Sequence, residues 1–90
     1  MEVLKGENKF FVGDDEETPI AELTYRHKDE DTIIADHTYV SEELRGQGVA
    51  GKLFKALVEF VREENIKVIP ECSYIEAKMD RSTKYDDIRA

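Results

Sequence analysis

The fold is decided at residues 44–53, which read LRGQGVAGKL. Three of the six residues from Gly46 to Gly51 are glycines, and this density is costly unless the backbone turns tightly or approaches another group closely. Before this stretch the hydrophobic residues alternate as they do in strands, and after it they recur with helical spacing. We therefore expect a glycine loop that joins a strand to the start of a helix.

Three strands are predicted before the loop, over residues 7–13, 20–27 and 32–40. The second strand alternates, with Ala21, Leu23 and Tyr25 on one face, which is typical of a half-buried antiparallel strand. The third strand is rich in β-branched and aromatic residues. Its alternation is interrupted by the polar run of residues 36–38, which favours a β-bulge or a functional stretch.

One amphipathic helix is predicted directly after the loop. Its apolar stripe has the spacing of a single helix face and comprises Ala50, Leu53, Phe54, Leu57, Val58 and Val61. Asn65 favours a left-handed end to this helix. A short apolar strand is expected at residues 67–70. Ser73 is expected to cap a second helix over residues 74–79, with Glu76 in the reciprocal capping position.

These elements predict a single domain over residues 1–90 with an α/β fold built on a mixed sheet. Their order is β-β-β-α-β-α, an antiparallel meander followed by a right-handed crossover to a parallel strand. In the polar tail, Tyr85 and Ile88 are the expected hydrophobic anchors. The 90 residues leave no room for an eight-unit βα barrel or a two-halved dinucleotide fold, which need roughly 200 residues or more.

Composition excludes several classes of function. The chain has 13 Lys and Arg against 21 Asp and Glu, a net charge of −8, which argues against nucleic-acid binding. No apolar run approaches the roughly 20 residues of a membrane span, and the first residues do not resemble a signal peptide. The lone Cys72 indicates a cytoplasmic setting, and the two histidines complete no zinc-type spacing. We therefore expect no nucleic acid, no membrane and no metal.

The glycine loop has the chemistry of an anion site. The first-turn N–H groups of a helix lack intrahelical partners, and the helix dipole is positive at that end. Arg45 and Lys52 add positive charge beside it. Phosphate or diphosphate is the natural anion for such a site. The alternative is a turn whose glycines serve packing alone and bind no ligand.

Two phosphate-binding patterns match the loop only in part. Gly46-x-Gly48-x-x-Gly51 fits the dinucleotide fingerprint, and Glu71 falls where an acidic ribose partner is expected. However, antiparallel strands come before this motif, and residues 41–45 separate it too far from the preceding strand. The glycine spacing before Lys52 also resembles a P-loop, but Leu53 stands where a Mg²⁺-binding hydroxyl is required.

A third pattern fits the whole context. Residues 45–50, Arg-Gly-Gln-Gly-Val-Ala, resemble the Arg/Gln-x-x-Gly-x-Gly/Ala signature of GNAT-type N-acetyltransferases. The resemblance is closest to very small single-domain members, which have His-Thr-x-Val before the loop and Pro-x-Cys-Ser-Tyr after the helix. Here these motifs are residues 37–40 and 70–74. The similarity extends over residues 20–80, with the motifs in the right order and spacing.

The resemblance implies an acetyl-CoA site. In this family the loop and the helix start hold the diphosphate, and the preceding strand pairs with the pantetheine arm and polarises the thioester carbonyl. The implied binding residues are Thr38, Tyr39, Val40, Arg45, Gly46, Gln47, Gly48, Val49, Ala50, Gly51 and Lys52. The next parallel strand, which leads to Cys72, is expected to splay away and open a cleft.

The resemblance also makes His37 and Cys72 the candidate catalytic residues. In a direct route, His37 or a water that it orients takes the proton of the acceptor amine. In a ping-pong route, the Cys72 thiolate carries the acetyl group. The alternatives are a small buried cysteine and a strand histidine bonded to a carboxylate. Tyr74 could act as a general acid or line the cleft, although we favour a core anchor.

Two main hypotheses of function follow, with a dinucleotide-binding fragment as a weaker third. The first is an acetyl-CoA-dependent N-acetyltransferase that acts on an amine acceptor. The second is a CoA- or acyl-CoA-binding module with little turnover, acting as a sensor or interaction domain. The short tail leaves the acceptor site open or completed by a second subunit, so we expect a monomer or a weak homodimer. The acidic balance suits a cationic amine.

Overall fold

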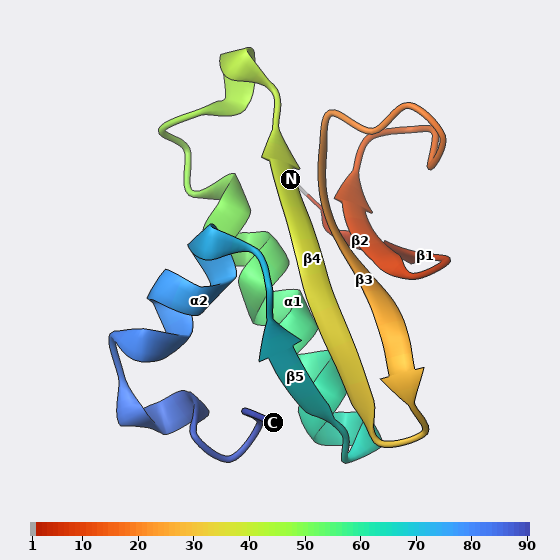
Figure 1. Cartoon of the computed structure of the whole chain (residues 1–90). Coiled ribbons are helices and arrows are strands. Elements are labelled where there is room, and N and C mark those ends of the chain that lie inside the picture. Colours follow the sequence, from red (N-terminus) through yellow and green to blue (C-terminus); the bar gives the residue numbers. More distant parts are fainter. Residues whose placement is uncertain (1) are drawn as a thin grey trace.

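The computed structural model describes residues 2–90, which form a mixed sheet with two helices on it. The elements are β1 (Leu4–Gly6), β2 (Lys9–Val12), β3 (Ala21–Asp29), β4 (Thr32–Val40), η1 (Glu42–Leu44), α1 (Val49–Glu64), β5 (Lys67–Pro70), α2 (Ser73–Asp80) and η2 (Thr83–Tyr85). The strands lie in the order β1-β2-β3-β4-β5, antiparallel except for the parallel β4–β5 pair (Figure 1). The predicted α/β class, the meander and the parallel crossover are confirmed.

The predicted first strand is wrong in its extent, because the chain turns within it. Glu7 and Asn8 form a two-residue connection between β1 and β2, and Gly6 pairs with Lys9 across it. Asn8 has a φ of 58°, a left-handed conformation that asparagine tolerates better than most residues. The element order therefore gains a strand before the predicted meander.

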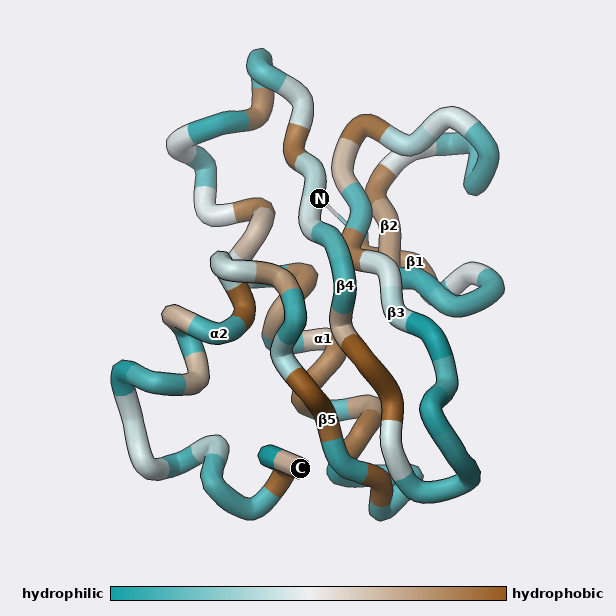
Figure 2. Tube along the Cα trace, viewed as in Figure 1, coloured by the Kyte–Doolittle hydropathy of each residue, from teal (hydrophilic) through white to brown (hydrophobic). Residues whose placement is uncertain are grey.

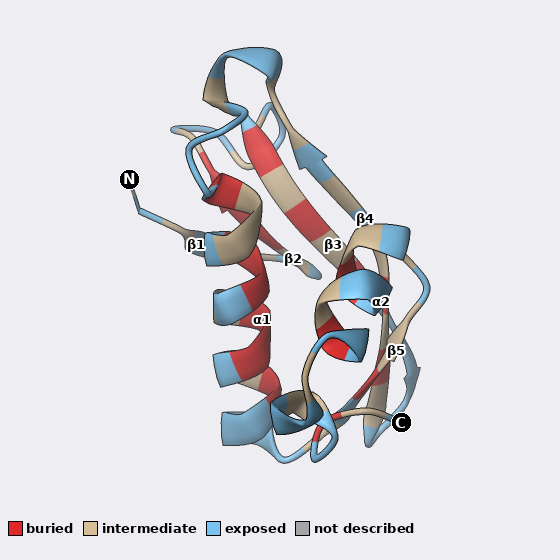
Figure 3. Cartoon of the chain, turned by 90° about the vertical axis from the view of Figure 1, so that its left-hand side faces the viewer, coloured by how far each residue is buried: buried red, intermediate tan, exposed pale blue. Residues whose placement is uncertain are grey.

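Both helices lie on the same side of the sheet (Figure 3). The residues of this side form one core cluster, which includes Leu23, Ile33, Ala35, Val68, Leu53, Leu57, Ile75, Met79 and Ile88. Figure 2 shows the matching hydrophobic stretches in the first half of β4, in β5 and along α1. No helix within residues 2–90 covers the opposite side, and none is long and apolar enough to cross a membrane.

The predicted helix after the loop is confirmed as α1, with one change in its buried stripe. Val49 is buried in place of Ala50, which is half-buried at the rim beside the glycine loop. The other five stripe residues are buried as predicted. Asn65 ends α1 with φ 58° and ψ 45°, and its N–H donates to the carbonyls of Val61 and Arg62. The left-handed stop is therefore also confirmed.

The predicted bulge in β4 is present at Asp36. Thr24 pairs with His37 and Tyr25 with Ala35, so Asp36 is the extra residue between them. Beyond the bulge, Thr38 lies opposite the buried Leu23 and shares its face of the sheet. The bulge therefore decides which side chains of β4 face the helices.

The end of the chain is held as predicted, but α2 begins differently. Ile88 is buried, and Tyr85 packs edge-on against Phe54 with ring centroids 5.0 Å apart. Ser73 is not a cap, because the helix already includes it and Cys72 occupies the N-cap position without a side-chain hydrogen bond. The Cys72 carbonyl accepts from the Glu76 N–H at 2.9 Å. The chain thus enters α2 one residue earlier than predicted.

Candidate functional site

The glycine loop and the start of α1 enclose a pocket with a volume of about 200 Å³, which we call the glycine-loop pocket. Leu44 and Tyr74 contribute to its wall. Seven of the eleven residues predicted to bind acetyl-CoA also line it, namely Val40, Arg45, Gly46, Gly48, Val49, Ala50 and Gly51. Thr38, Tyr39, Gln47 and Lys52 are not among the lining residues.

Two glycines of the loop are required by its backbone. Gly46 and Gly48 have φ values of 84° and 75°, where a side chain would be strained. Gly48 is also the N-cap of α1, and it offers no side chain to the orphan N–H groups of the first turn. The first turn contains no acidic residue either. The positive end of the helix dipole is therefore left available to an anion.

Gly51 has a different significance, because it is an ordinary helical residue in the first turn of α1. A Cβ built at this position would meet no atom within 4 Å, so neither strain nor internal packing requires a glycine here. A helical glycine costs about 1 kcal/mol relative to alanine. The missing side chain instead leaves open space beside the exposed first-turn N–H groups. This open cradle fits a bulky anion such as a diphosphate.

Arg45 supplies positive charge at the mouth of the pocket. Its side chain is exposed, and its Nε donates to the Val40 carbonyl at 3.4 Å, which ties the loop to the end of β4. No carboxylate in residues 2–90 forms an ion pair with it. Gln47 stabilises the loop internally, since its Nε2 donates to the Glu43 carbonyl at 3.2 Å. Arg45 is thus free to meet a phosphate.

The strands β4 and β5 separate next to this pocket. Their pairing ends at Ala35 and Pro70, and the N–H groups of Glu71 and Cys72 both donate to the Ala35 carbonyl at 3.0 Å. From this point to Val40, β4 pairs only with β3 within the described chain. Five residues of β4 therefore have an open backbone edge that leads to the glycine loop.

The two candidate catalytic residues lie on opposite sides of the sheet. Cys72 is half-buried against the core, with its Sγ 3.4 Å from the Oγ1 of Thr38 on the helix side. His37 is exposed and lies opposite Thr24, on the side without helices. No hydrogen bond joins His37 and Cys72 in residues 2–90. Where β4 and β5 separate, a thiol therefore lies on one side of the sheet and an imidazole on the other.

A network of ion pairs lies on the side of the sheet without helices, where β4 and β5 separate. The Arg26 guanidinium bonds both oxygens of Glu71, at 2.8 and 3.2 Å, and one oxygen of Asp36 at 3.1 Å. The Thr24 hydroxyl donates to Asp36 at 2.6 Å. The hydrogen bonds from Arg26 lower the pKa of Glu71 below its usual value. Sequence reasoning missed Arg26, although its place on the polar face of an alternating strand was predictable.

Tyr74 combines two of its predicted roles. It packs against the core cluster, as an anchor would, and it also lines the glycine-loop pocket. Partial burial raises the pKa of its phenol above the usual value of 10.0. The hydroxyl therefore stays protonated at neutral pH and can donate a hydrogen bond.

The class of the protein follows from these features together with sequence comparison. The sequence profile of the GCN5-related N-acetyl-transferases matches residues 9–88, which is nearly the whole chain. The chain therefore belongs to the GCN5-related N-acetyltransferase family. A Staphylococcus aureus protein described as GCN5-like has the same fold in solution, with a TM-score of 0.81 and 48% identity. That match covers 99% of this chain and 87% of the other.

A more distant solved structure shares the fold, and curated proteins match part of the sequence. A GNAT family acetyltransferase from Elizabethkingia anophelis, crystallised with acetyl-CoA bound, shares the fold with a TM-score of 0.59. It is 16% identical, over 81% of this chain and 50% of that chain. Protein NATD1 of Xenopus tropicalis is 39% identical over 56 residues, and that of Homo sapiens is 38% identical. These matches cover 62% of this chain and about half of each NATD1 protein.

Proposed function

We propose that the chain is an N-acetyltransferase that transfers the acetyl group of acetyl-CoA to an amine acceptor. The observation that carries this proposal is the continuity between the glycine-loop pocket and the open edge of β4. An elongated thioester with a diphosphate can lie along such a path. Its anion would meet the first-turn N–H groups and Arg45, and its arm would pair with the backbone beyond Ala35.

The reaction needs a polarised thioester carbonyl and a base for the acceptor amine. We expect a backbone N–H in the stretch of β4 that holds Thr38, Tyr39 and Val40 to donate to that carbonyl oxygen. The amine nitrogen forms the new bond to the carbonyl carbon while the carbon–sulfur bond breaks. The leaving thiolate takes up a proton, so that the products are an amide and free CoA.

His37 and Cys72 suit two alternative routes for this reaction, because they lie on opposite sides of the sheet. His37 or a water that it orients takes the amine proton from the uncovered side, where an acceptor can approach. Cys72 lies on the helix side, next to Thr38. There the Cys72 thiolate would instead take the acetyl group first and release CoA, and the amine would then cleave the acyl–sulfur bond.

A second candidate function is a CoA-binding module with little turnover. The separation of His37 from Cys72 favours this alternative, because no contact between them assembles a catalytic pair. A dinucleotide-binding fragment has less support. Glu71, which would bind the ribose, is held by Arg26, and β3 runs antiparallel to the strand before the loop.

Binding and transfer are tested separately. Acetyl-CoA at a hundredfold excess over Kd should stabilise the fold by about 2.7 kcal/mol, whereas NAD at the same concentration should not. Incubation with labelled acetyl-CoA and a panel of amines then measures transfer. Loss of transfer in both His37→Ala and Cys72→Ala, with binding retained, supports the enzyme. Binding without transfer to any amine supports the module, and the absence of any thermal shift contradicts both.

A further inference from the structure

Arg26 is a charged residue of β3 that no step of the proposed acyl transfer uses. Its side chain reaches across β4, which lies between β3 and β5 (Figure 1), to Glu71 just beyond the end of β5. It also bonds Asp36 at the bulge of β4. Within residues 2–90, no other lysine or arginine pairs with two carboxylates. Arg26 therefore ties three neighbouring segments together where β4 and β5 separate.

The two carboxylates that Arg26 binds stand directly before the two candidate catalytic residues. Asp36 precedes His37 on β4, and Glu71 precedes Cys72 at the start of α2. The guanidinium lies 3.1 Å from one oxygen of Asp36 and 2.8 and 3.2 Å from the two oxygens of Glu71. The bond to Glu71 is thus bidentate, which fixes its direction as well as its length. A shift of either carboxylate moves the backbone beside a candidate catalytic residue.

The backbone alone attaches the Cys72 segment to the sheet at one point. The N–H groups of Glu71 and Cys72 share a single acceptor, the Ala35 carbonyl, at 3.0 Å each. The pairing of β4 with β5 ends at this residue, and the chain then enters α2. The side-chain bonds between Arg26 and Glu71 are a second attachment of the same segment.

The charges around Arg26 show what its loss would do. The hydrogen bonds from Arg26 lower the pKa of Glu71, against a smaller opposite effect from the charge of Asp36. Loss of the guanidinium therefore leaves two carboxylates that repel each other across the gap between β4 and β5. Stability alone does not explain this arrangement, because an ion pair between half-exposed side chains contributes little to it.

We propose that Arg26 is a positioning residue for acyl transfer. It acts through Asp36 and Glu71, and so holds the backbone that carries the two candidate catalytic residues. The inference rests on the proposed function. Arg26 is not among the residues that line the glycine-loop pocket, and neither of its two carboxylate partners lines it. The rate of transfer therefore depends on Arg26, whereas the affinity for acetyl-CoA does not.

The test is a kinetic double-mutant cycle, measured with the amine of the panel that the wild-type protein acetylates fastest. Arg26→Gln should lower kcat by about tenfold or more, since small misplacements of reacting groups are costly, and should change the KM for acetyl-CoA by less than about twofold. In the Glu71→Gln background, the same substitution should lower kcat much less, because its main partner is already changed. Arg26→Lys keeps the charge without the planar fork and should have an intermediate kcat.

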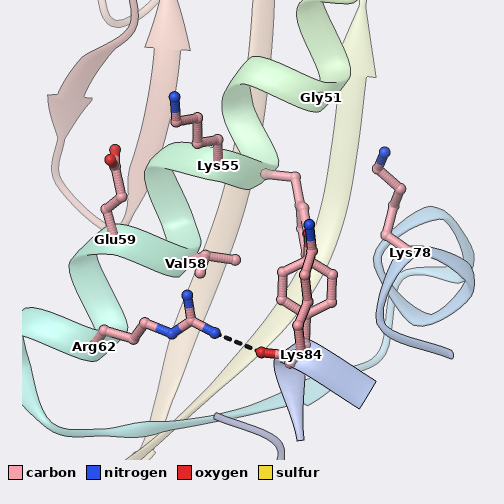
Figure 4. A pocket seen from close by; sticks show the side chains of 9 residues that line it. Gly51, Lys55, Val58, Glu59, Arg62, Lys78 and Lys84 are labelled. Atoms are coloured by element: carbon pink, nitrogen blue, oxygen red, sulfur yellow. Dashed lines mark hydrogen bonds between the residues drawn. The ribbon is translucent and has the colours of Figure 1, made fainter. Parts of the chain in front are cut away.

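Arg62→Gln is the matched control. The Arg62 guanidinium also makes two bonds to one carboxylate, that of Asp87, at 3.0 and 3.1 Å, and both side chains are exposed to a similar extent as Arg26 and Glu71. Figure 4 shows Arg62 on α1 and its further bond to the Lys84 carbonyl. This variant should lose about as much stability as Arg26→Gln and keep the wild-type kcat. The difference in kcat between the two variants then reports positioning rather than unfolding.

The outcomes separate this inference from the proposed function. Equal kcat values for Arg26→Gln and Arg62→Gln overturn the inference and leave the proposed function intact. A raised KM for the amine with an unchanged kcat also overturns it, because Arg26 then binds the acceptor. Equal losses of kcat in the wild-type and Glu71→Gln backgrounds overturn it as well, since Arg26 then does not act through Glu71. If the wild-type protein transfers acetyl groups to no amine, the proposed function fails and this inference fails with it.

Discussion

The Thr38 hydroxyl and the Cys72 thiol lie 3.4 Å apart, at the point where β5 leaves β4. The two residues are far apart in sequence, and the bulge at Asp36 together with the parallel pairing of β4 and β5 brings them together. The contact places the only cysteine of the chain on the helix side of the splayed strands. It also gives the thiol a hydroxyl partner that can donate to its deprotonated form.

Thr38→Val tests this contact, because it removes the hydroxyl and keeps the shape. We expect the Cys72 thiol of this variant to react severalfold more slowly with iodoacetamide near neutral pH, since the thiolate loses a hydrogen-bond donor. Mass spectrometry of timed samples gives the rate. Thr24→Val is the control, as its hydroxyl bonds Asp36 instead. Equal rates for Thr38→Val and wild type would show that the contact does not affect the thiol.

Alanine substitutions at Gly48 and Gly51 should change the stability of the fold in opposite directions. Gly48→Ala places a side chain at a φ of 75° and is expected to destabilise the fold by about 1 kcal/mol. Gly51→Ala adds a methyl group to open space in a helix and is expected to raise Tm by a few degrees, an effect of about 1 kcal/mol or less. Differential scanning fluorimetry measures both.

The same Gly51→Ala variant should bind acetyl-CoA more weakly, because the added methyl group projects into the space where the diphosphate is proposed to lie. A gain in stability with a loss of affinity is the expected pair of results. Calorimetric titration measures the affinity, and Ala56→Gly, on the same helix but not among the residues that line the glycine-loop pocket, controls for helix propensity. Unchanged affinity in Gly51→Ala would place the anion elsewhere.

Much of this architecture was predictable from local patterns. Burial against a single core explains the alternation of Ala21, Leu23 and Tyr25 and the stripe from Leu53 to Val61. The spacing of the hydrophobic residues alone therefore predicts this strand and this helix. The turn at Asn8 was missed because its left-handed conformation interrupts a run that otherwise favours a strand. The sequence also misplaces the start of α2 at Ser73. The N–H of Cys72 donates to the Ala35 carbonyl, and the helix begins directly after Cys72; no local pattern predicts this long-range bond.

The sequence predicts the parts of the site that one continuous segment forms, but not the parts where distant segments meet. The glycine-loop pocket is lined mostly by residues of one continuous stretch, 40–51. A groove of about 380 Å³ is lined by residues of α1, α2 and η2, and no local pattern predicts that Lys55 and Lys84 line the same groove. His37 and Cys72 lie on opposite sides of the sheet because of the register of three strands, and sequence patterns do not fix this register.

The core packing of α1 gives a direct prediction about stability. Leu57 is fully buried in the core cluster, and Leu57→Ala is expected to cost about 3 kcal/mol through lost burial and a cavity. Leu57→Met keeps the volume and should cost less than about 1.5 kcal/mol. Urea denaturation measures both. Similar costs for the two variants would mean that the site relaxes around the missing atoms.

The ion pair between Arg26 and Glu71 should make stability depend on pH in one direction. The hydrogen bonds from Arg26 hold the pKa of Glu71 below 4.5 in the folded state. A carboxyl group with a lowered folded pKa stabilises the fold above its unfolded pKa, and this contribution is lost as pH falls through the folded pKa. The difference in Tm between wild type and Glu71→Gln should therefore be positive near pH 7 and vanish in strong acid.

Because the Arg26 and Glu71 side chains are both about half exposed, the difference in Tm should be small and should shrink further at high salt. Glu59→Gln is the matched control, since Glu59 is an exposed carboxylate that forms no ion pair in residues 2–90. Its Tm should follow the wild-type value at every pH. A difference for Glu71→Gln that persists unchanged into strong acid would assign the stabilisation to packing of the side chain rather than to its charge.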